Sequence, residues 1–149
     1  PTSASAKLPA PKSQPVALAK PRLTVSGRDS TAELQQFCSR LSDQEVAALG
    51  LSVILTGTDF YGARVTIRNT GNVPVRVYPG NVAIHFGDEA AGIIPIDHPS
   101  FLQRGVLEPG QVTSGLVMYR ARIDIGVAMR LGGGGISYND DSIQITYER

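Results

Sequence analysis

The sequence is poor in the residues on which most catalytic and metal sites depend. It has 1 cysteine and 2 histidines among 149 residues. Because Cys38 is alone, an intrachain disulfide and a four-cysteine zinc site are both excluded. We expect Cys38 to be a small buried residue on a helix, with an intermolecular disulfide or a reactive thiol as the alternative.

Long apolar runs are also missing. No stretch approaches the roughly 18 consecutive apolar residues of a membrane-spanning helix, so no membrane span is predicted. No charged and then apolar leader opens the chain, so we expect any export signal to have been removed or never to have existed. Pro1 fits cleavage of an initiator methionine as well as cleavage of an export signal.

Lysine is confined to the first part of the chain. Residues 1–28 hold all three lysines, two arginines and no acid, whereas the remainder holds nine arginines and all 13 acidic residues. Half of the 10 prolines lie in residues 1–28 as well. Dense proline blocks a continuous helix, and so few apolar residues cannot offset the entropy of ordering, so an extended basic arm is predicted.

The arm is expected to contact a protein partner. Its charges are sparse and no aromatic residue lies between them for base stacking, so nucleic acid is not the expected partner. The residues that would make the contact are Lys7, Lys12, Lys20 and Arg22.

Two short helices are predicted over residues 29–50. Ser30 with Glu33, and Ser42 with Glu45, each have the spacing of a capping box. Apolar residues at helical spacing follow Ser30, and Gly50 is a plausible end of the second helix. We expect the pair to cover one end or edge of a sheet, with partner docking as the alternative.

The strongest period-two alternation runs from Tyr61 to Tyr78, on both sides of an Asn-Thr-Gly-Asn turn. This pattern predicts a β-hairpin with one buried and one polar face. The polar face would carry Arg64, Arg68 and Arg76 beside Tyr78. These residues are either solvated or an interface patch, since arginine and tyrosine are common in interfaces.

About eight short strands are predicted from Leu51 onward, with turn signals between them and no intervening helices. This spacing favours an antiparallel β-sandwich or a small barrel over residues 51–149. The expected strands cover 51–57, 61–69, 73–78, 81–86, 92–96, 111–120, 122–130 and 142–148. The four glycines Gly132–Gly135 are interpreted as an inter-strand loop.

A family resemblance rests on three sequence features. They are R-N-T-G-N at the end of a strand, L-E-P-G-Q at Leu107–Gln111, and the apolar strand Ser114–Tyr119 that follows. The chain resembles, over about residues 50–148, the telokin-like, immunoglobulin-type domains of bacterial exported proteins. That resemblance implies an antiparallel sandwich of seven to nine strands, a role in binding or assembly, and no catalytic residues.

The remaining candidates for chemistry are weak. Asp97-His98-Pro99-Ser100 is expected to be a turn, because neighbouring residues on one loop rarely orient as a triad. The set His85, Asp88, Glu89 and His98 matches no zinc spacing, and Asn139-Asp140-Asp141 lacks the ligand series of an EF-hand. No enzyme activity, metal or cofactor is predicted.

The sequence therefore predicts a non-enzymatic structural module. In this interpretation, an immunoglobulin-like β-sandwich docks on a larger assembly, and the arm tethers it to a neighbouring subunit, in a homo-oligomer for example. The setting would be an exported or cell-surface complex, which the resemblance favours, or decoration of a virion surface. The alternative is a soluble sandwich that binds a small ligand or metal in a pocket lined by the Asp97–Arg104 loop and His85.

Overall fold

A computed structural model describes residues 18–51, 60–86, 89–120 and 134–148. Nine strands, two α-helices and one 3-10 turn form in this part of the chain. In chain order they are β1 (Arg22–Asp29), α2 (Thr31–Arg40), α3 (Asp43–Ala48), β2 (Phe60–Asn69), β3 (Val75–Val77), η2 (Pro79–Asn81), β4 (Val82–Phe86), β5 (Glu89–Ile94), β6 (Gly105–Leu107), β7 (Val112–Arg120), β8 (Gly134–Tyr138) and β9 (Gln144–Tyr147).

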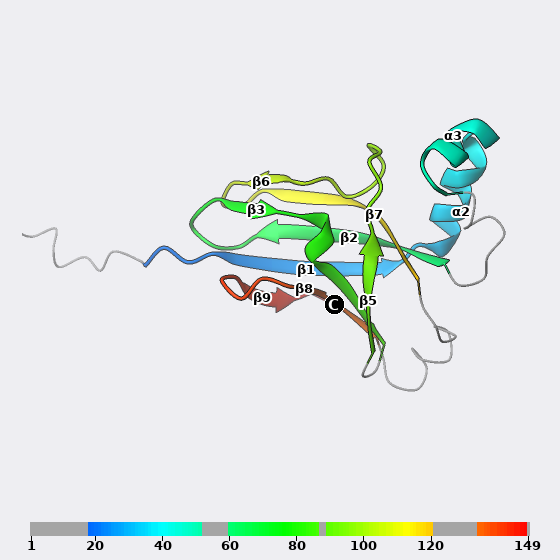
Figure 1. The fold of residues 1–149 in the computed structure, drawn as a ribbon. Helices are drawn as coiled ribbons and strands as arrows, with labels where there is room; N and C mark the ends of the chain where they lie inside the picture. Colours follow the sequence, from blue (N-terminus) through cyan, green and yellow to red (C-terminus); the bar gives the residue numbers. More distant parts are fainter. Residues whose placement is uncertain (1–17, 52–59, 87–88, 121–133, 149) are drawn as a thin grey trace, which may run out of the picture.

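Seven strands form one folded-over sheet in the order β8-β4-β5-β7-β2-β1-β9, and β3 with β6 forms a second sheet (Figure 1). Only two residue pairs join β5 to β7, namely Ile93 with Tyr119 and Ile94 with Met118. At the far edge, Ile136 of β8 packs on Gly27 of β1, where a side chain would collide with it. The sheet therefore closes on itself in two layers, which confirms the expected mainly β, sandwich-like fold.

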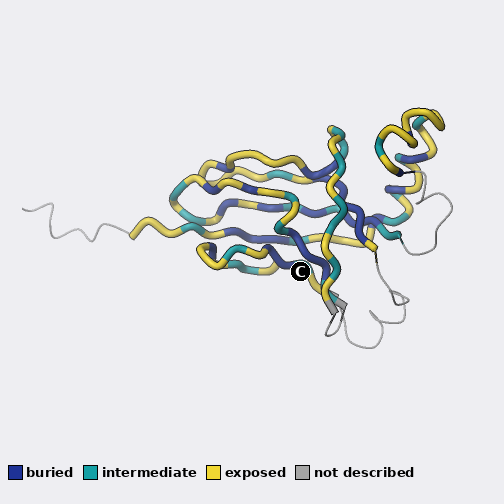
Figure 2. Tube along the Cα trace, viewed as in Figure 1, coloured by how far each residue is buried: buried dark blue, intermediate teal, exposed yellow. Residues whose placement is uncertain are grey.

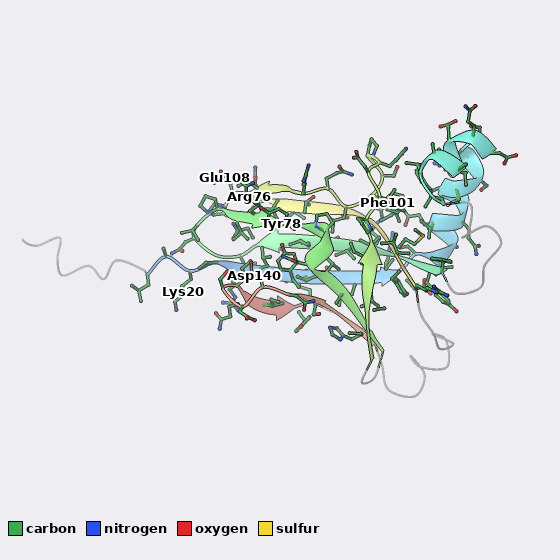
Figure 3. All side chains as sticks on the ribbon, viewed as in Figure 1. Lys20, Arg76, Tyr78, Phe101, Glu108 and Asp140 are labelled. Carbon is green, nitrogen blue, oxygen red and sulfur yellow. The ribbon has the colours of Figure 1, made fainter. Side chains whose placement is uncertain are left out.

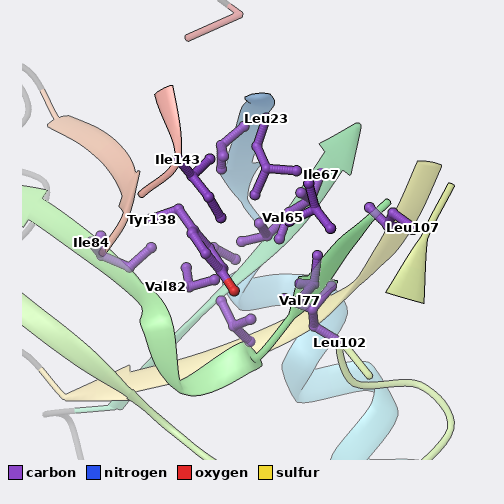
Figure 4. Close-up of a cluster of buried hydrophobic side chains, with 14 of the residues drawn as sticks. Leu23, Val65, Ile67, Val77, Val82, Ile84, Leu102, Leu107, Tyr138 and Ile143 are labelled. Carbon is purple, nitrogen blue, oxygen red and sulfur yellow. The ribbon is translucent and has the colours of Figure 1, made fainter. Parts of the chain in front are cut away.

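The main core lies between these layers. Alternate residues of β1 and β2, including Leu23, Val25, Val65 and Ile67, meet Tyr138 of β8 and the valines of β3 (Figure 4). Buried residues form dark bands along the strands in Figure 2. In β1, Thr24 is buried along with Leu23 and Val25. In β2, buried positions 63, 65, 67 and 69 alternate with partly or fully exposed positions 64, 66 and 68. Period-two burial of this kind is what a sheet with one core-facing side requires.

The helix pair is confirmed at one end of the sheet (Figure 1). Leu34 and Cys38 of α2 and Val46 of α3 are buried in a second cluster with Leu116 and Met118, on the other side of β7 from the main core. No helix among the described residues is long and apolar enough to cross a membrane.

Of the two expected capping boxes, the second is confirmed and the first is wrong. The Ser42 hydroxyl accepts the Glu45 amide at 3.2 Å, and the Glu45 side chain reaches back to Ser42. At α2, Ser30 makes no side-chain cap bond. Asp29 accepts the Thr31 amide at 2.9 Å instead, and Glu33 is drawn away to Arg64.

The hairpin expected between Tyr61 and Tyr78 is wrong. β2 has no free edge for β3, because β1 pairs with one of its edges and β7 with the other. The chain instead crosses from one sheet to the other at Asn69, and β3 pairs with β6. A period-two pattern identifies strands, but not which strand each one pairs with.

The buried side chain of Asn69 holds this crossing in place. Its amide nitrogen donates to the carbonyls of Val73 and Leu107, each at 2.8 Å. Its side-chain oxygen accepts the Gly71 amide at 3.0 Å. Only 1% of the residue is exposed, so these bonds satisfy polar groups that water cannot reach.

The expected end of the arm at residue 28 is also wrong, because β1 begins at Arg22 and lies inside the sheet. Leu23 and Val25 are buried, and β1 pairs in parallel with β9, so the sheet is mixed rather than wholly antiparallel.

The remaining predictions to compare with the structure concern two strands and the glycine-rich loop. Of the strand predicted over 51–57, only Leu51 is described, and it is not in a strand; the strand predicted over 122–130 lies outside the described residues. Gly134 and Gly135 belong to β8 rather than to a loop.

Candidate functional site

Pairing of β1 with β2 gathers arginines on the outer face of the sheet. Arg28 lies opposite Arg64, and Arg68 lies opposite Thr24. Arg64 and Arg68 alternate with the core residues of β2, so their side chains point outward. Arg28 lies directly opposite Arg64 and is therefore on the same face. We call Arg22, Arg28, Arg64 and Arg68 the arginine face. Three of its members were predicted as contact residues, one from the arm and two from the supposed hairpin.

Two of these arginines bind other elements of the fold. The Arg64 Nε donates to both carboxylate oxygens of Glu33, at 3.1 and 3.3 Å, and its Nη2 contacts the same group. Because Arg64 hydrogen bonds to the charged form, the pKa of Glu33 lies below its usual value. Arg22 donates to the Thr146 hydroxyl from Nε at 3.1 Å and from Nη2 at 2.8 Å. Arg64 thus fastens α2 to β2, and Arg22 fastens β1 to β9.

The side chain of Arg68 is more exposed than that of Arg64. Its Nη1 lies 3.7 Å from the Glu148 carboxylate, and both side chains are about half exposed, at 51% and 47%. A pair this long and this exposed contributes little to stability. Arg68 is thus available to a partner at little cost to the fold.

Arg76 belongs to the other sheet and Tyr78 follows the same strand, so neither joins the arginine face. Arg76 lies opposite Val106 of β6, and Val106 is 48% exposed. Tyr78, 43% exposed, follows β3, and its backbone amide donates to the buried Tyr138 hydroxyl at 2.8 Å. The predicted patch therefore divides between the two sheets. Figure 3 shows where Arg76 and Tyr78 lie.

The base of the arm is held by the turn between β2 and β3. The Lys20 amide donates to Asn72 Oδ1 at 2.8 Å, and Asn72 Nδ2 donates to the Leu18 carbonyl at 3.3 Å. The Thr70 amide donates to the Arg22 carbonyl at 3.1 Å. A side chain at Gly71 would collide with the Lys20 carbonyl and lie 2.8 Å from the Arg22 nitrogen. Of the predicted arm contacts, Lys7 and Lys12 lie outside the described residues.

A cleft of about 520 Å³ opens where β5 separates from β7. Its lining comes from four segments: 78–80, 93–97, 101–104 and 116–117. The lining is mainly apolar, with Tyr78, Asp97 and Arg104 among its polar members. A mainly apolar concavity with a few polar groups has the character of a binding site.

Backbone pairing sets one wall of the cleft. The Leu102 amide donates to the Leu116 carbonyl at 2.9 Å, and the Leu116 amide donates to the Ser100 carbonyl at 3.0 Å. Phe101 and Leu102 then enter the second and the main core respectively. This crossing needs Gly115, because a Cβ there would lie 2.6 Å from the Leu102 Cα and 2.7 Å from the Phe101 carbonyl carbon.

The two histidines lie in different surroundings. His98 Nδ1 accepts the Ser100 amide at 3.1 Å, and its ring meets Phe37 edge-on with centroids 4.7 Å apart. His85 contacts the Ser137 hydroxyl and lines a separate hollow of about 400 Å³. The pocket expected from the Asp97–Arg104 loop and His85 together is therefore two pockets. Within the described ranges, no three metal-binding side chains come together.

Sequence reasoning missed the residues that build these surfaces, namely Asn69, Asn72 and Gly115. The Asn-Thr-Gly-Asn segment was the available signal for two of them, since asparagine side chains readily bond to nearby backbone. Alternation of Leu23 and Val25 with Thr24 and Ser26 could have identified β1. Nothing in the local sequence marks Gly115, because the loop that packs on it is distant in the chain.

No model of a known protein family matches the sequence, and no curated protein matches it. Among solved structures, the secreted protein MPT63 of Mycobacterium tuberculosis is similar, with a TM-score of 0.43, 10% identity, and coverage of 60% of this chain and 65% of that one. A functionally unknown protein of Listeria monocytogenes is similar with a TM-score of 0.33 and 13% identity, over 52% of this chain and 46% of that one. The candidate lipoprotein YcdA of Bacillus subtilis is similar with a TM-score of 0.36 and 16% identity, over 56% of this chain and 30% of that one. The chain spans less than two thirds of each, and TM-scores this low assign it no function.

Proposed function

We propose that the protein is a non-enzymatic structural module that joins subunits of a larger assembly. In this proposal, the β-sandwich docks on one partner, and the basic, proline-rich arm reaches a neighbouring subunit. The module is of the telokin-like, immunoglobulin type, as the sequence resemblance implies, and acts outside the cytoplasm, in the periplasm or at the cell surface. Decoration of a virion surface is the alternative setting, in which the sandwich would dock and the arm would tether in the same way.

This proposal rests on the hydrogen bonds that Asn72 makes with Leu18 and Lys20 at the base of the arm, which we call the clamp. Lys20 and Leu18 are bonded to Asn72, so the arm leaves the domain at a defined point. A segment fixed at its root loses less entropy when its distal part binds, because the search is confined to a local volume. An anchored root suits a tether better than a spacer that merely separates two domains.

The exposed part of the arginine face suits protein contact. Arg68 and Arg28 are exposed beside the hydroxyls of Thr66 and Ser26. Thr66 donates to Ser114 at 3.2 Å, which orders that part of the face. A polar, arginine-rich surface resembles the rim of a protein interface, so an acidic partner surface is the expected match.

Small-ligand binding is a second candidate, because the cleft of about 520 Å³ has the volume of a ligand site. It requires no arm, and this difference separates the two candidates. Saturable binding of a small molecule to the intact chain, with the arm dispensable for function, would favour it.

The proposal is tested by removing residues 1–17 in the native host. This deletion stops short of Leu18, so it leaves the clamp and β1 intact. Size fractionation of gentle extracts should place the full chain in a large complex and the shortened chain in a small one. Equal elution of the two forms would overturn the tether. Fractionation of the cells tests the proposed location.

A further inference from the structure

We propose that the cleft beside Tyr78 receives the proline-rich arm, residues 1–17, of a second copy of this chain. This inference rests on the proposed function and adds the identity of the partner and its binding surface. Among the segments that line the cleft, residues 78–80 supply Tyr78 and Pro79, and residues 93–97 supply Pro95. These three rings and the isoleucines around them form an apolar, ring-lined groove.

Such a groove matches the composition of the arm. Residues 8–11 read Leu-Pro-Ala-Pro, and a further Pro-Val pair stands at residues 15–16. Segments of this kind favour the polyproline II conformation, which docks between aromatic and proline rings at low entropic cost. The backbone carbonyls of a polyproline II segment have no internal partners. Tyr78 and Arg104 are lining residues, and their side chains carry a hydroxyl and a guanidinium that can donate to such carbonyls.

The charges in the lining of the cleft are balanced. Asp97 and Arg104 both line the cleft, and both are exposed. Asp97 offers a partner to Lys7 or Lys12 of the arm, whereas Arg104 would repel them. The arm is therefore expected to run in the direction that brings a lysine towards Asp97, and apolar contact rather than net charge supplies most of the affinity.

The position of the arm's root favours binding of the arm in the cleft of a second copy over binding in the cleft of its own chain. Figure 3 places Lys20 at one end of the sandwich and Phe101 towards the other, with Tyr78 between them, so the cleft extends away from the root of the arm. The clamp on Asn72 holds the root at the Lys20 end. Seventeen residues in polyproline II conformation span roughly 50 Å, enough to reach an adjacent molecule. To fill its own cleft, a proline-stiffened arm would have to reverse along the domain.

The test is a photo-crosslink within the full chain. Ala10→p-benzoylphenylalanine places the crosslinker between Pro9 and Pro11. Equal amounts of ¹⁴N- and ¹⁵N-labelled protein are mixed, irradiated and digested with trypsin. No lysine or arginine occurs from Val77 to Gln103, so one tryptic peptide, Val77–Arg104, contains three of the four segments of the cleft lining.

We expect crosslinks between arm peptide Leu8–Lys12 and peptide Val77–Arg104, with mixed isotope pairs among them. Tyr78→Ala should lower their yield about tenfold, the effect of losing an interface anchor worth roughly 1.4 kcal/mol. Arg104→Ala should also lower the yield; because this substitution removes the trypsin site at residue 104, its crosslinks are counted on the longer peptide Val77–Arg120. Tyr147→Ala is the matched control, because Tyr147 is 57% exposed and does not line the cleft, and it should leave the yield unchanged.

Crosslinks that never mix isotopes would overturn the second copy and assign the cleft to the chain's own arm. Crosslinks to other peptides, or none, would overturn the cleft as the receiving site. If the arm crosslinks elsewhere on another subunit, or residues 1–17 remain necessary for the native complex, the tether function stands without the cleft. Failure of the inference is in this way distinguishable from failure of the proposed function.

Discussion

The backbone amide of Lys20 donates to the side-chain oxygen of Asn72 at 2.8 Å, across 52 positions of sequence. This bond joins the two parts of the chain that sequence reasoning had singled out separately, the basic arm and the Tyr61–Tyr78 segment. The root of the arm is therefore set by the turn in that segment rather than by the arm's own composition.

Asn72→Ala should release the root of the arm while leaving the sandwich folded. The Lys20 amide would lose its acceptor, so its hydrogen exchange should quicken markedly, as expected for a locally opened segment. The Leu18 carbonyl would lose its donor as well. The free energy of unfolding should fall by only about 1–2 kcal/mol, the usual net value of two such exposed bonds. NMR-detected exchange is the measurement, and Asn139→Ala, an exposed asparagine in another turn, is the control.

Asn69→Ala should destabilise the whole domain. It removes three hydrogen bonds from a residue that is 1% exposed and leaves the Val73 and Leu107 carbonyls without this donor. The expected loss is about 2–4 kcal/mol in the free energy of unfolding, measured by urea titration. A loss below about 1 kcal/mol would show that Asn69 does not hold the crossing between the sheets.

Gly115→Ala should displace the segment around Phe101 and Leu102 and distort the cleft. The new Cβ would meet backbone atoms, which cannot move aside as a flexible side chain does, so a cost of about 1–3 kcal/mol is expected. Gly92→Ala is a matched strand glycine with open space around its added Cβ, and it should be close to neutral. Equal effects of the two substitutions on the urea midpoint would contradict this packing.

The pair Glu33–Arg64 should make stability depend on pH. The pKa of Glu33 in the folded protein is lowered from 4.5 by its bond to Arg64. Ionised Glu33 therefore favours the native state above about pH 4.5, and this stabilisation is lost as the pH falls through the lowered pKa. Glu33→Gln and Arg64→Ala should each flatten the urea midpoint against pH in that acidic range. An unchanged profile in both variants would remove the pair from the account of acid stability.

Cys38 should resist thiol reagents in the native state. It is 1% exposed in the second core, and burial raises the pKa of its thiol, so little reactive thiolate forms. Labelling by a thiol-specific chromogenic reagent should be slow until urea unfolds the protein. Rapid labelling of the folded chain would favour the reactive-thiol alternative.

Local patterns predicted the strands and helices well, but not how they pair. Alternation identified β2, β4, β7 and β9, and the apolar stripe with the second capping box identified the helix pair. The pairing of β1 with β2 could not be predicted, because the alternation of Leu23 and Val25 marks a strand but not the strand that lies beside it. The arginine face depends on that pairing, so sequence alone divided its members between an arm and a hairpin.

Candidate contact residues were chosen by residue type, and the structure assigns several of them a partner within the fold. Arg64 bonds to Glu33 and Arg22 to Thr146, which alternation along a strand cannot reveal. The cleft depends on Gly115, where a distant loop crosses β7, and no local sequence signal marks such a crossing. Tyr78 was identified for its type and lines the cleft for a different reason, its place after β3.

The central claim is that the arm joins one copy of this chain to another. Its most direct test is to compare the sedimentation velocity of the purified full chain with that of the same chain without residues 1–17. The account predicts that the full chain associates beyond its monomer mass of 15.8 kDa as concentration rises, and that the shortened chain remains monomeric at matched concentrations. A full chain that stays monomeric, or a shortened chain that associates equally well, would contradict it.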